Sequence, residues 1–174
     1  MQDIIIRDTT VKDLLPLRTM HGRSWRDTYP NEAQGVSRRW VEERTARWIT
    51  PEGIEESKEH VKDIYGHPDH LHKVATDGGK IVGVVHVSKT KEKQHLEALY
   101  VAKEYYGTGL AQILMDEAMK WSDRDRAIDL QVVTYNERAK AFYRKYGFEE
   151  VPGTEAKFAE VIPVITMKKE RTKV

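Results

Sequence analysis

The sequence contains no cysteine, which excludes disulfide bonds, thiolate metal sites and cysteine nucleophiles. It also lacks an excess of either charge, because 29 Lys and Arg residues face 28 Asp and Glu residues and leave a formal net charge of +1. Such a balanced chain has no overall field to attract nucleic acid or an anionic membrane. We therefore expect neither as a partner.

Long apolar runs are missing as well. The isoleucines at residues 4–6 form a run far too short for a signal peptide or a membrane span, so a cytoplasmic location is expected. Hydrophobic residues make up 39% of the chain and charged residues 33%, which is typical of a globular protein. Without repeats or a linker, the 174 residues are expected to form a single domain, residues 1–174.

The spacing of apolar residues divides the chain into two parts. After a short β-branched strand at residues 4–7, a period near 3.6 predicts helices. They are expected from about residue 11, over residues 36–48, and from residue 51 to about residue 65. Thr10 and Ser37 are suitable helix caps.

Beyond residue 70 the period changes to two, and strands alternate with two further helices. The expected strands cover residues 71–76, 81–87, 95–101, 128–134, 148–151 and 161–167. The expected helices cover residues 110–121 and 136–146. Pro163 has no backbone N–H, which predicts that the last strand lies at an edge or contains a bulge.

The stretch from residue 95 to residue 111 joins a strand, a glycine turn and a helix start. Gly107 and Gly109 allow close approach of a ligand, and the exposed amides of a helix start favour a negative group. The turn therefore suits a diphosphate, although a Gly-x-Gly junction can also be a simple turn. It lacks the lysine of a P-loop and the third glycine of a dinucleotide fingerprint.

A second motif follows about 25 residues later. Its residues are Asn136, Ala139, Phe142, Tyr143, Gly147 and Phe148. The pair of motifs resembles the GNAT superfamily of acyl-coenzyme-A N-acyltransferases, in which a loop Gln/Arg-x-x-Gly-x-Gly/Ala precedes a closing element Asn-x-x-Ala-x-x-Phe-Tyr-x-x-x-Gly-Phe. In the loop, Gly109 and Ala111 match, whereas Tyr106 stands where the family usually carries Arg or Gln.

The resemblance implies an α/β fold of the mixed α+β kind, with a central, mostly antiparallel sheet of about seven strands flanked by helices. It implies transfer of an acetyl group from acetyl-coenzyme A to a primary amine, by direct attack in a ternary complex of a monomer or homodimer. The coenzyme-binding residues that it implies are Leu99, Tyr100, Val101, Tyr106, Gly107, Thr108, Gly109, Leu110, Ala111, Asn136, Lys140 and Tyr143. The alternative is a coenzyme-A-binding regulatory or sensor protein without turnover.

The chemistry of this reaction asks for a proton acceptor and a proton donor. An alkyl amine with a pKa near 10 is only about one-thousandth neutral at pH 7, and the departing thiolate needs a proton. The resemblance implies that Tyr143 supplies that proton and that a backbone amide of residues 99–101 stabilises the oxyanion. A core role for Tyr143 is the alternative.

Glu97 is the candidate general base, directly or through water, because it is an acid in an otherwise apolar strand. Burial there would raise its pKa. It could instead face solvent, and His95 or His86 could take its place.

The run from Ser24 to Tyr29 resembles the Ser-Trp-x-x-Thr-Tyr opening of the PaiA-type polyamine acetyltransferases. Trp25 and Tyr29 could form an aromatic wall over a cationic amine such as spermidine or spermine. Asp27, Glu32 and Glu97 could complement its remaining ammonium groups. Ordinary packing of the two aromatic residues is the alternative, and amino acids, antibiotics and protein N-termini are alternative acceptors.

Three histidines, His67, His70 and His72, form a His-x-x-His-x-His pattern. Two of them flank Pro68 in an expected loop, with no cysteine available as a further ligand. We expect these side chains to be solvated and to bind no metal.

Overall fold

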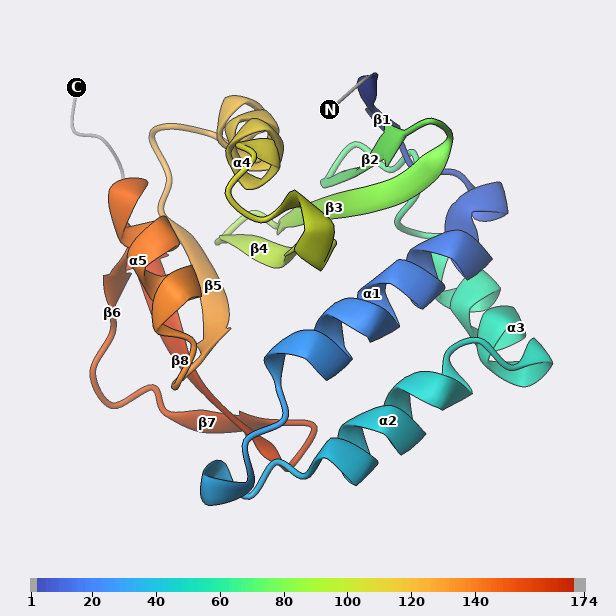
Figure 1. The fold of residues 1–174 in the computed structure, drawn as a ribbon. Helices are drawn as coiled ribbons and strands as arrows, with labels where there is room; N and C mark the ends of the chain where they lie inside the picture. The colour runs from blue at the N-terminus through green and yellow to red at the C-terminus, as the bar shows by residue number, and fades with distance from the viewer. Residues whose placement is uncertain (1–2, 171–174) are drawn as a thin grey trace.

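The computed structural model describes residues 3–170 and contains one mixed sheet of eight strands (Figure 1). The strand order is β1-β2-β3-β4-β5-β8-β6, with β7 also paired to β8. The strands are β1 (Ile4–Asp8), β2 (His70–Asp77), β3 (Lys80–Lys89), β4 (Gln94–Val101), β5 (Ile128–Val133), β6 (Glu149–Glu150), β7 (Ala156–Phe158) and β8 (Ile162–Lys169). Every pairing is antiparallel except the parallel pair β4–β5. The expected architecture is confirmed, with one short strand, β7, in addition.

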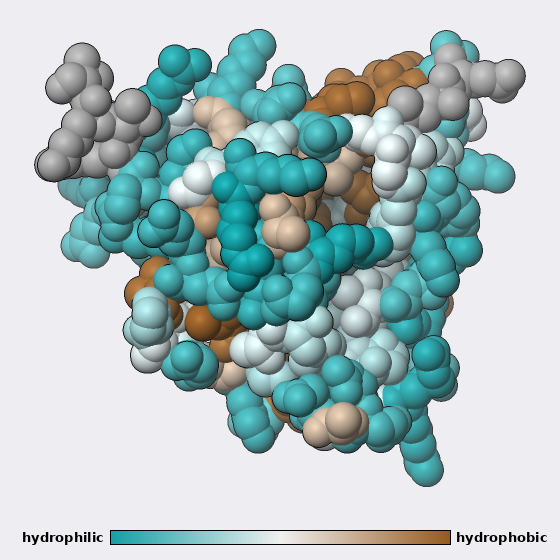
Figure 2. All heavy atoms as spheres, turned by 60° about the vertical axis from the view of Figure 1, so that its left-hand side comes forward, coloured by the Kyte–Doolittle hydropathy of each residue, from teal (hydrophilic) through white to brown (hydrophobic). Residues whose placement is uncertain are grey.

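Within residues 3–170, five α-helices cover the two faces of this sheet (Figure 1). They are α1 (Leu14–Thr28), α2 (Arg38–Arg47), α3 (Pro51–Val61), α4 (Leu110–Trp121) and α5 (Glu137–Lys145). None of the helices within residues 3–170 combines the length and the apolar character that crossing a membrane requires. In the view of Figure 2 the surface is mostly hydrophilic, and hydrophobic residues appear only in separate patches.

Two packed layers fix the helices to the sheet. On one face Leu17 and Met20 of α1 pack against Val74, Ile81 and Val84. On the other face, α4 and α5 share the largest core cluster with β3, β4 and β5. Full burial of each large apolar side chain contributes roughly 1.5–3 kcal/mol, so these helical stripes hold the layers together.

The position of Pro163 differs from the expectation, because β8 lies inside the sheet between β5 on one side and β6 and β7 on the other. Pro163 is the second residue of β8 and lies opposite Lys157. Its carbonyl accepts the backbone N–H of Thr134 at 3.0 Å. A proline so close to the strand start costs little of the hydrogen-bonded ladder, so an interior strand accommodates it.

The expectation that all three histidine side chains are solvated is wrong for two of them, which are partly buried. His70 and His72 lie on β2, where His70 Nδ1 is 3.0 Å from His86 Nε2 of β3. Burial lowers the pKa of His72 to about 4 and that of His86 to about 3. Within the described part of the chain, no three His, Cys, Asp or Glu side chains are grouped so that they could hold a metal ion.

Candidate active site

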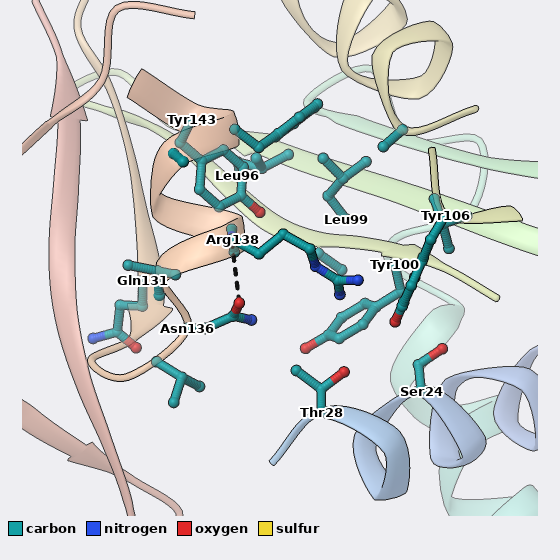
Figure 3. Close-up of a pocket in the computed structure, with 18 of the residues that line it drawn as sticks. Ser24, Thr28, Leu96, Leu99, Tyr100, Tyr106, Gln131, Asn136, Arg138 and Tyr143 are labelled. Atoms are coloured by element: carbon teal, nitrogen blue, oxygen red, sulfur yellow. Dashed lines mark hydrogen bonds between the residues drawn. The ribbon is translucent and has the colours of Figure 1, made fainter. Parts of the chain in front are cut away.

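The parallel pairing of β4 with β5 covers only three residue pairs, from Gln94–Ile128 to Leu96–Leu130. After that the two strands separate, and among residues 3–170 no strand pairs with the β5-facing edge of residues 97–101. A cavity of about 690 Å³ lies beside this open edge (Figure 3). Backbone N–H and C=O groups need partners, so the edge suits an extended ligand that carries amides of its own.

Glu97 occupies an irregular position at the start of the open edge. Leu96 pairs with Val87 and Ala98 pairs with His86, so Glu97 is an extra residue in β4. Such β-bulges redirect a side chain and are frequent beside active sites. The Glu97 side chain lines the cavity, is 41% exposed and accepts a hydrogen bond from Ser88 Oγ at 2.7 Å. The strand therefore presents this carboxylate to the cavity but does not bury it.

The glycine turn before α4 forms another part of the cavity wall. Gly107 and Gly109 have φ angles of 75° and 89°, a left-handed backbone that strains other residues. No side chain of the described residues caps α4, and its first turn carries no acidic residue. The first N–H groups of a helix have no partner inside it, and Gly109, Ala111 and Gln112 line the cavity. The turn therefore fits a diphosphate group.

Two residues of this loop have side chains outside the cavity lining. Thr108 Oγ1 donates a hydrogen bond to the Tyr105 carbonyl at 2.7 Å, and the Leu110 side chain is fully buried in the core. Both side chains hold the turn in shape. Either residue can therefore contact a ligand only through its backbone.

Helix α5 contributes its cap and one phenol. Asn136 Oδ1 accepts the N–H of Ala139 at 3.1 Å, so Asn136 is the helix cap (Figure 3). The Tyr143 ring packs beside Phe142 and Phe148, whereas its hydroxyl points into the cavity toward Leu99 (Figure 3). Burial raises the pKa of Tyr143, so this phenol remains protonated at neutral pH and can donate a hydrogen bond.

Aromatic residues from distant segments form the opposite end of the cavity. Trp25 and Tyr29 of α1 line it, with ring centroids 4.8 Å apart, and Phe158 of β7 lies 5.7 Å from Trp25. The Tyr29 hydroxyl is 2.6 Å from the Tyr100 hydroxyl. Trp25 and Tyr29 are only 4% and 8% exposed, so they serve both as packing residues and as cavity wall.

Asp27 is not brought to this site. It is exposed and does not line the cavity. Two residues along a helix correspond to about 200° of rotation, so Asp27 points away from the face that carries Trp25. Its predicted contact with the acceptor is therefore wrong.

Lys140 likewise lies away from the cavity lining. Its side chain is 9% exposed, and Nζ is 3.1 Å from carboxylate oxygens of both Glu137 and Glu150. Two carboxylates already neutralise this ammonium, so its predicted role in binding the coenzyme is corrected to a structural one. Arg138 and Lys145 do line the cavity, and Arg138 was missed because the sequence does not show where its side chain points.

Comparison with known families agrees with this geometry. Residues 42–171 match the family described as the acetyltransferase (GNAT) domain. The chain belongs to this GNAT family. It is an acetyl-coenzyme-A-dependent acetyltransferase, and the open β4 edge and the glycine turn before α4 fit the pantetheine arm and the diphosphate of that co-substrate. No curated protein shows significant similarity to the sequence.

Solved structures show the same GNAT fold over nearly the whole chain. The PaiA N-acetyltransferase of Thermoplasma acidophilum, in complex with coenzyme A, is 22% identical with a TM-score of 0.71, over 97% of this chain and 99% of that one. A GNAT-family acetyltransferase from Streptococcus pneumoniae is also 22% identical, with a TM-score of 0.69 over 98% and 100%. The ribosomal-protein-S18-alanine N-acetyltransferase of Escherichia coli is 17% identical, with a TM-score of 0.63 over 99% and 96%. At these identities the likeness extends to the fold alone.

Proposed function

We propose that this GNAT protein is a single catalytic domain that acetylates a primary amine of a small molecule by direct attack in a ternary complex. The observation that supports the proposal is the meeting of three features in one cavity. These are the open β4 edge, the phenol of Tyr143 and the aromatic wall around Trp25. The acceptor and the acetyl donor could therefore be held together without a covalent enzyme intermediate.

Each part of the cavity has a role in this proposal. The backbone of Leu99, Tyr100 and Val101 would hold the amide-bearing arm of the co-substrate, and residues 106–111 would hold its diphosphate. Asn136 would orient the arm at the start of α5. The co-substrate supplies an acetyl group activated as a thioester. The Tyr143 hydroxyl would donate a hydrogen bond, and then a proton replaced from solvent, to the departing sulfur.

We propose a polyamine as the acceptor. Support comes from the aromatic wall of Trp25, Tyr29 and Phe158, which suits an alkylammonium ion, and from the likeness of the Ser24–Tyr29 run to PaiA-type enzymes. Among the described residues that line the cavity, Glu97 carries the only carboxylate. The amine to be acetylated would be drawn toward Glu97, while the rest of the polyamine would lie along the aromatic rings.

The deciding experiment measures thiol release from acetyl-coenzyme A with a panel of amines. The panel contains spermidine, spermine, putrescine, an aminoglycoside, free amino acids and peptides. We expect release that depends on the added amine and is fastest with the polyamines. Faster release with another class would overturn the polyamine assignment. Tight binding of coenzyme A without thiol release for any amine would overturn the proposal that the protein is catalytic and would favour a sensor.

A further inference from the structure

His95 and Asp129 form the second of the three pairs that join β4 to β5. His95 Nδ1 is hydrogen-bonded to Asp129 Oδ1, and His95 lines the cavity. Their side chains are 22% and 28% exposed, so the pair is partly shielded from water. The pair therefore sits at the closed end of the gap between the strands, next to the bulge at Glu97.

The alternation of side chains places this pair on one particular face of the sheet. Leu96, Ile128 and Leu130 belong to the core cluster that also contains Tyr143. Successive residues of a strand point to opposite faces, so His95 and Asp129 project to the other side, where α1 packs. A group on that side and the Tyr143 phenol would therefore reach a thioester in the cleft from opposite faces.

The contact with Asp129 also selects the tautomer of His95. An ionised carboxylate only accepts hydrogen bonds, so Nδ1 must carry a proton, and in the neutral ring Nε2 then keeps its lone pair. Nε2 lies 3.9 Å from Glu97 Oε2. The hydrogen bond from His95 lowers the pKa of Asp129, which keeps this carboxylate ionised and able to stabilise a protonated ring.

We infer that His95 is the proton acceptor for the amine, that Asp129 is its positioning residue, and that Glu97 orients the incoming ammonium group. This inference rests on the proposed function. A general base must be held in place with a lone pair free to take the proton. The contact with Asp129 fixes the His95 ring, whereas the Glu97 carboxylate is 41% exposed, which favours His95 as the base.

The reaction balances as follows. The ammonium group gives one proton to His95 Nε2, and the neutral nitrogen forms a bond to the acetyl carbon while the carbon–sulfur bond breaks. The nitrogen loses its second proton to solvent, and the sulfur receives one proton through Tyr143, so these two transfers cancel. His95 returns its proton to solvent, so the products are an N-acetyl amine, a thiol and one released proton.

Other charged groups near the pair enter its pH dependence. Lys93, beside β4, and Lys168 of β8 both act on the Asp129 carboxylate. On β3, His86 lies close enough to Glu97 to feel its charge. The carboxylates that approach the ring itself are Asp129, at Nδ1, and Glu97, at Nε2. Asp129 and Glu97 are therefore the partners to vary.

The kinetic test compares His95→Gln, Asp129→Asn and Glu97→Gln with the wild type, and uses the exposed His67→Gln as control. We expect kcat to fall about 100-fold or more in His95→Gln, with loss of the acidic limb of its pH profile. Asp129→Asn should lower kcat about tenfold, because the base would be less well positioned for the chemical step. Glu97→Gln should mainly raise KM, because the ammonium group would be attracted less strongly in the bound state. An unchanged rate and pH profile in His95→Gln would overturn the inference.

A measurement without turnover separates the failure of this inference from the failure of the proposed function. Nitrogen-15 NMR of the His95 ring in the wild type should show a protonated Nδ1 and a bare Nε2, and Asp129→Asn should lose this preference. A protonated Nε2 in the wild type would overturn the role of Asp129. If the wild type released no thiol with any amine of the panel, the proposed function would be overturned, whichever tautomer the NMR spectrum shows.

Discussion

The guanidinium carbon of Arg138 lies 3.7 Å from the centre of the Tyr106 ring. The two residues come from opposite walls of the cavity, because Arg138 is in the first turn of α5 and Tyr106 precedes the glycine turn of α4 (Figure 3). Tyr106 stands at the loop position where GNAT proteins usually carry Arg or Gln. Arg138 thus brings a positive charge to a loop that has a neutral tyrosine at this position.

Replacing Arg138 with Gln should weaken coenzyme-A binding about tenfold or more and change kcat little. The physical reason is that a charged hydrogen bond contributes about 1.5–3 kcal/mol, and this cation would face the diphosphate. Calorimetric titration with coenzyme A measures the effect. Arg144→Gln is the matched control, because Arg144 lies on the same helix and pairs with Glu150 outside the cavity. Equal affinities in both variants would contradict the prediction.

Replacing Tyr143 with Phe should lower kcat about 100-fold and leave coenzyme-A affinity nearly unchanged, because the ring packing is kept and only the proton donor is lost. Single-turnover thiol release measures the chemical step directly. Tyr146→Phe serves as the control, since Tyr146 caps the C-terminus of the same helix and its hydroxyl donates to Asp116 at 2.9 Å, outside the cavity lining. Similar rates for the two variants would assign Tyr143 to the core only.

The stability of the protein should fall as the pH drops from about 6.5 to about 4. Burial lowers the pKa of His72 to about 4 and of His86 to about 3 in the folded state, whereas an unfolded histidine titrates near 6.5. In this window the unfolded chain binds protons that the folded chain does not, so the free energy of unfolding decreases, by up to about 1.4 kcal/mol per pH unit for each histidine.

Denaturant unfolding at pH 7, 6, 5 and 4.5 measures this slope. His86→Gln should make the dependence on pH shallower, even if it lowers the stability at pH 7. His67→Gln, at an exposed position, should keep the wild-type slope. If stability were flat across this range, the two strand histidines could not be held neutral by the fold.

Replacing Gly53 with Ala should destabilise the protein by about 1–3 kcal/mol. A Cβ at this position would lie 2.0 Å from the carbonyl oxygen of Arg47, so α3 could not begin as close to the end of α2 as it does. Thermal or denaturant unfolding measures the loss. Glu56→Ala, an exposed position on the same helix, should change stability by less than about 0.5 kcal/mol.

Those parts of the site that depend on local sequence could be predicted. The turn at Gly107 and Gly109, the cap Asn136 and the following helix have the expected places, because glycine conformations and capping are set by neighbours in the chain. The directions of side chains around a helix were less accessible. Asp27 and Lys140 were expected at the site, yet rotation about α1 and two nearby carboxylates turn them elsewhere.

The contact of His95 with Asp129 could not be predicted from sequence. The two residues are 34 positions apart, and their contact depends on the register between two parallel strands. The two strands are joined by a crossover through α4, so no hairpin turn fixes that register. The same holds for Phe158, which reaches Trp25 only because the short strand β7 pairs with β8.

The short pairing between β4 and β5 has a mechanical consequence. Strands β1–β4 and strands β5–β8 are two halves of a sheet. Three residue pairs join them, all at one end of β4 and β5. A co-substrate laid along β4 would act as a temporary extra strand that ties the halves together. Loading with acetyl donor should therefore raise the melting temperature and slow amide exchange in both halves at once.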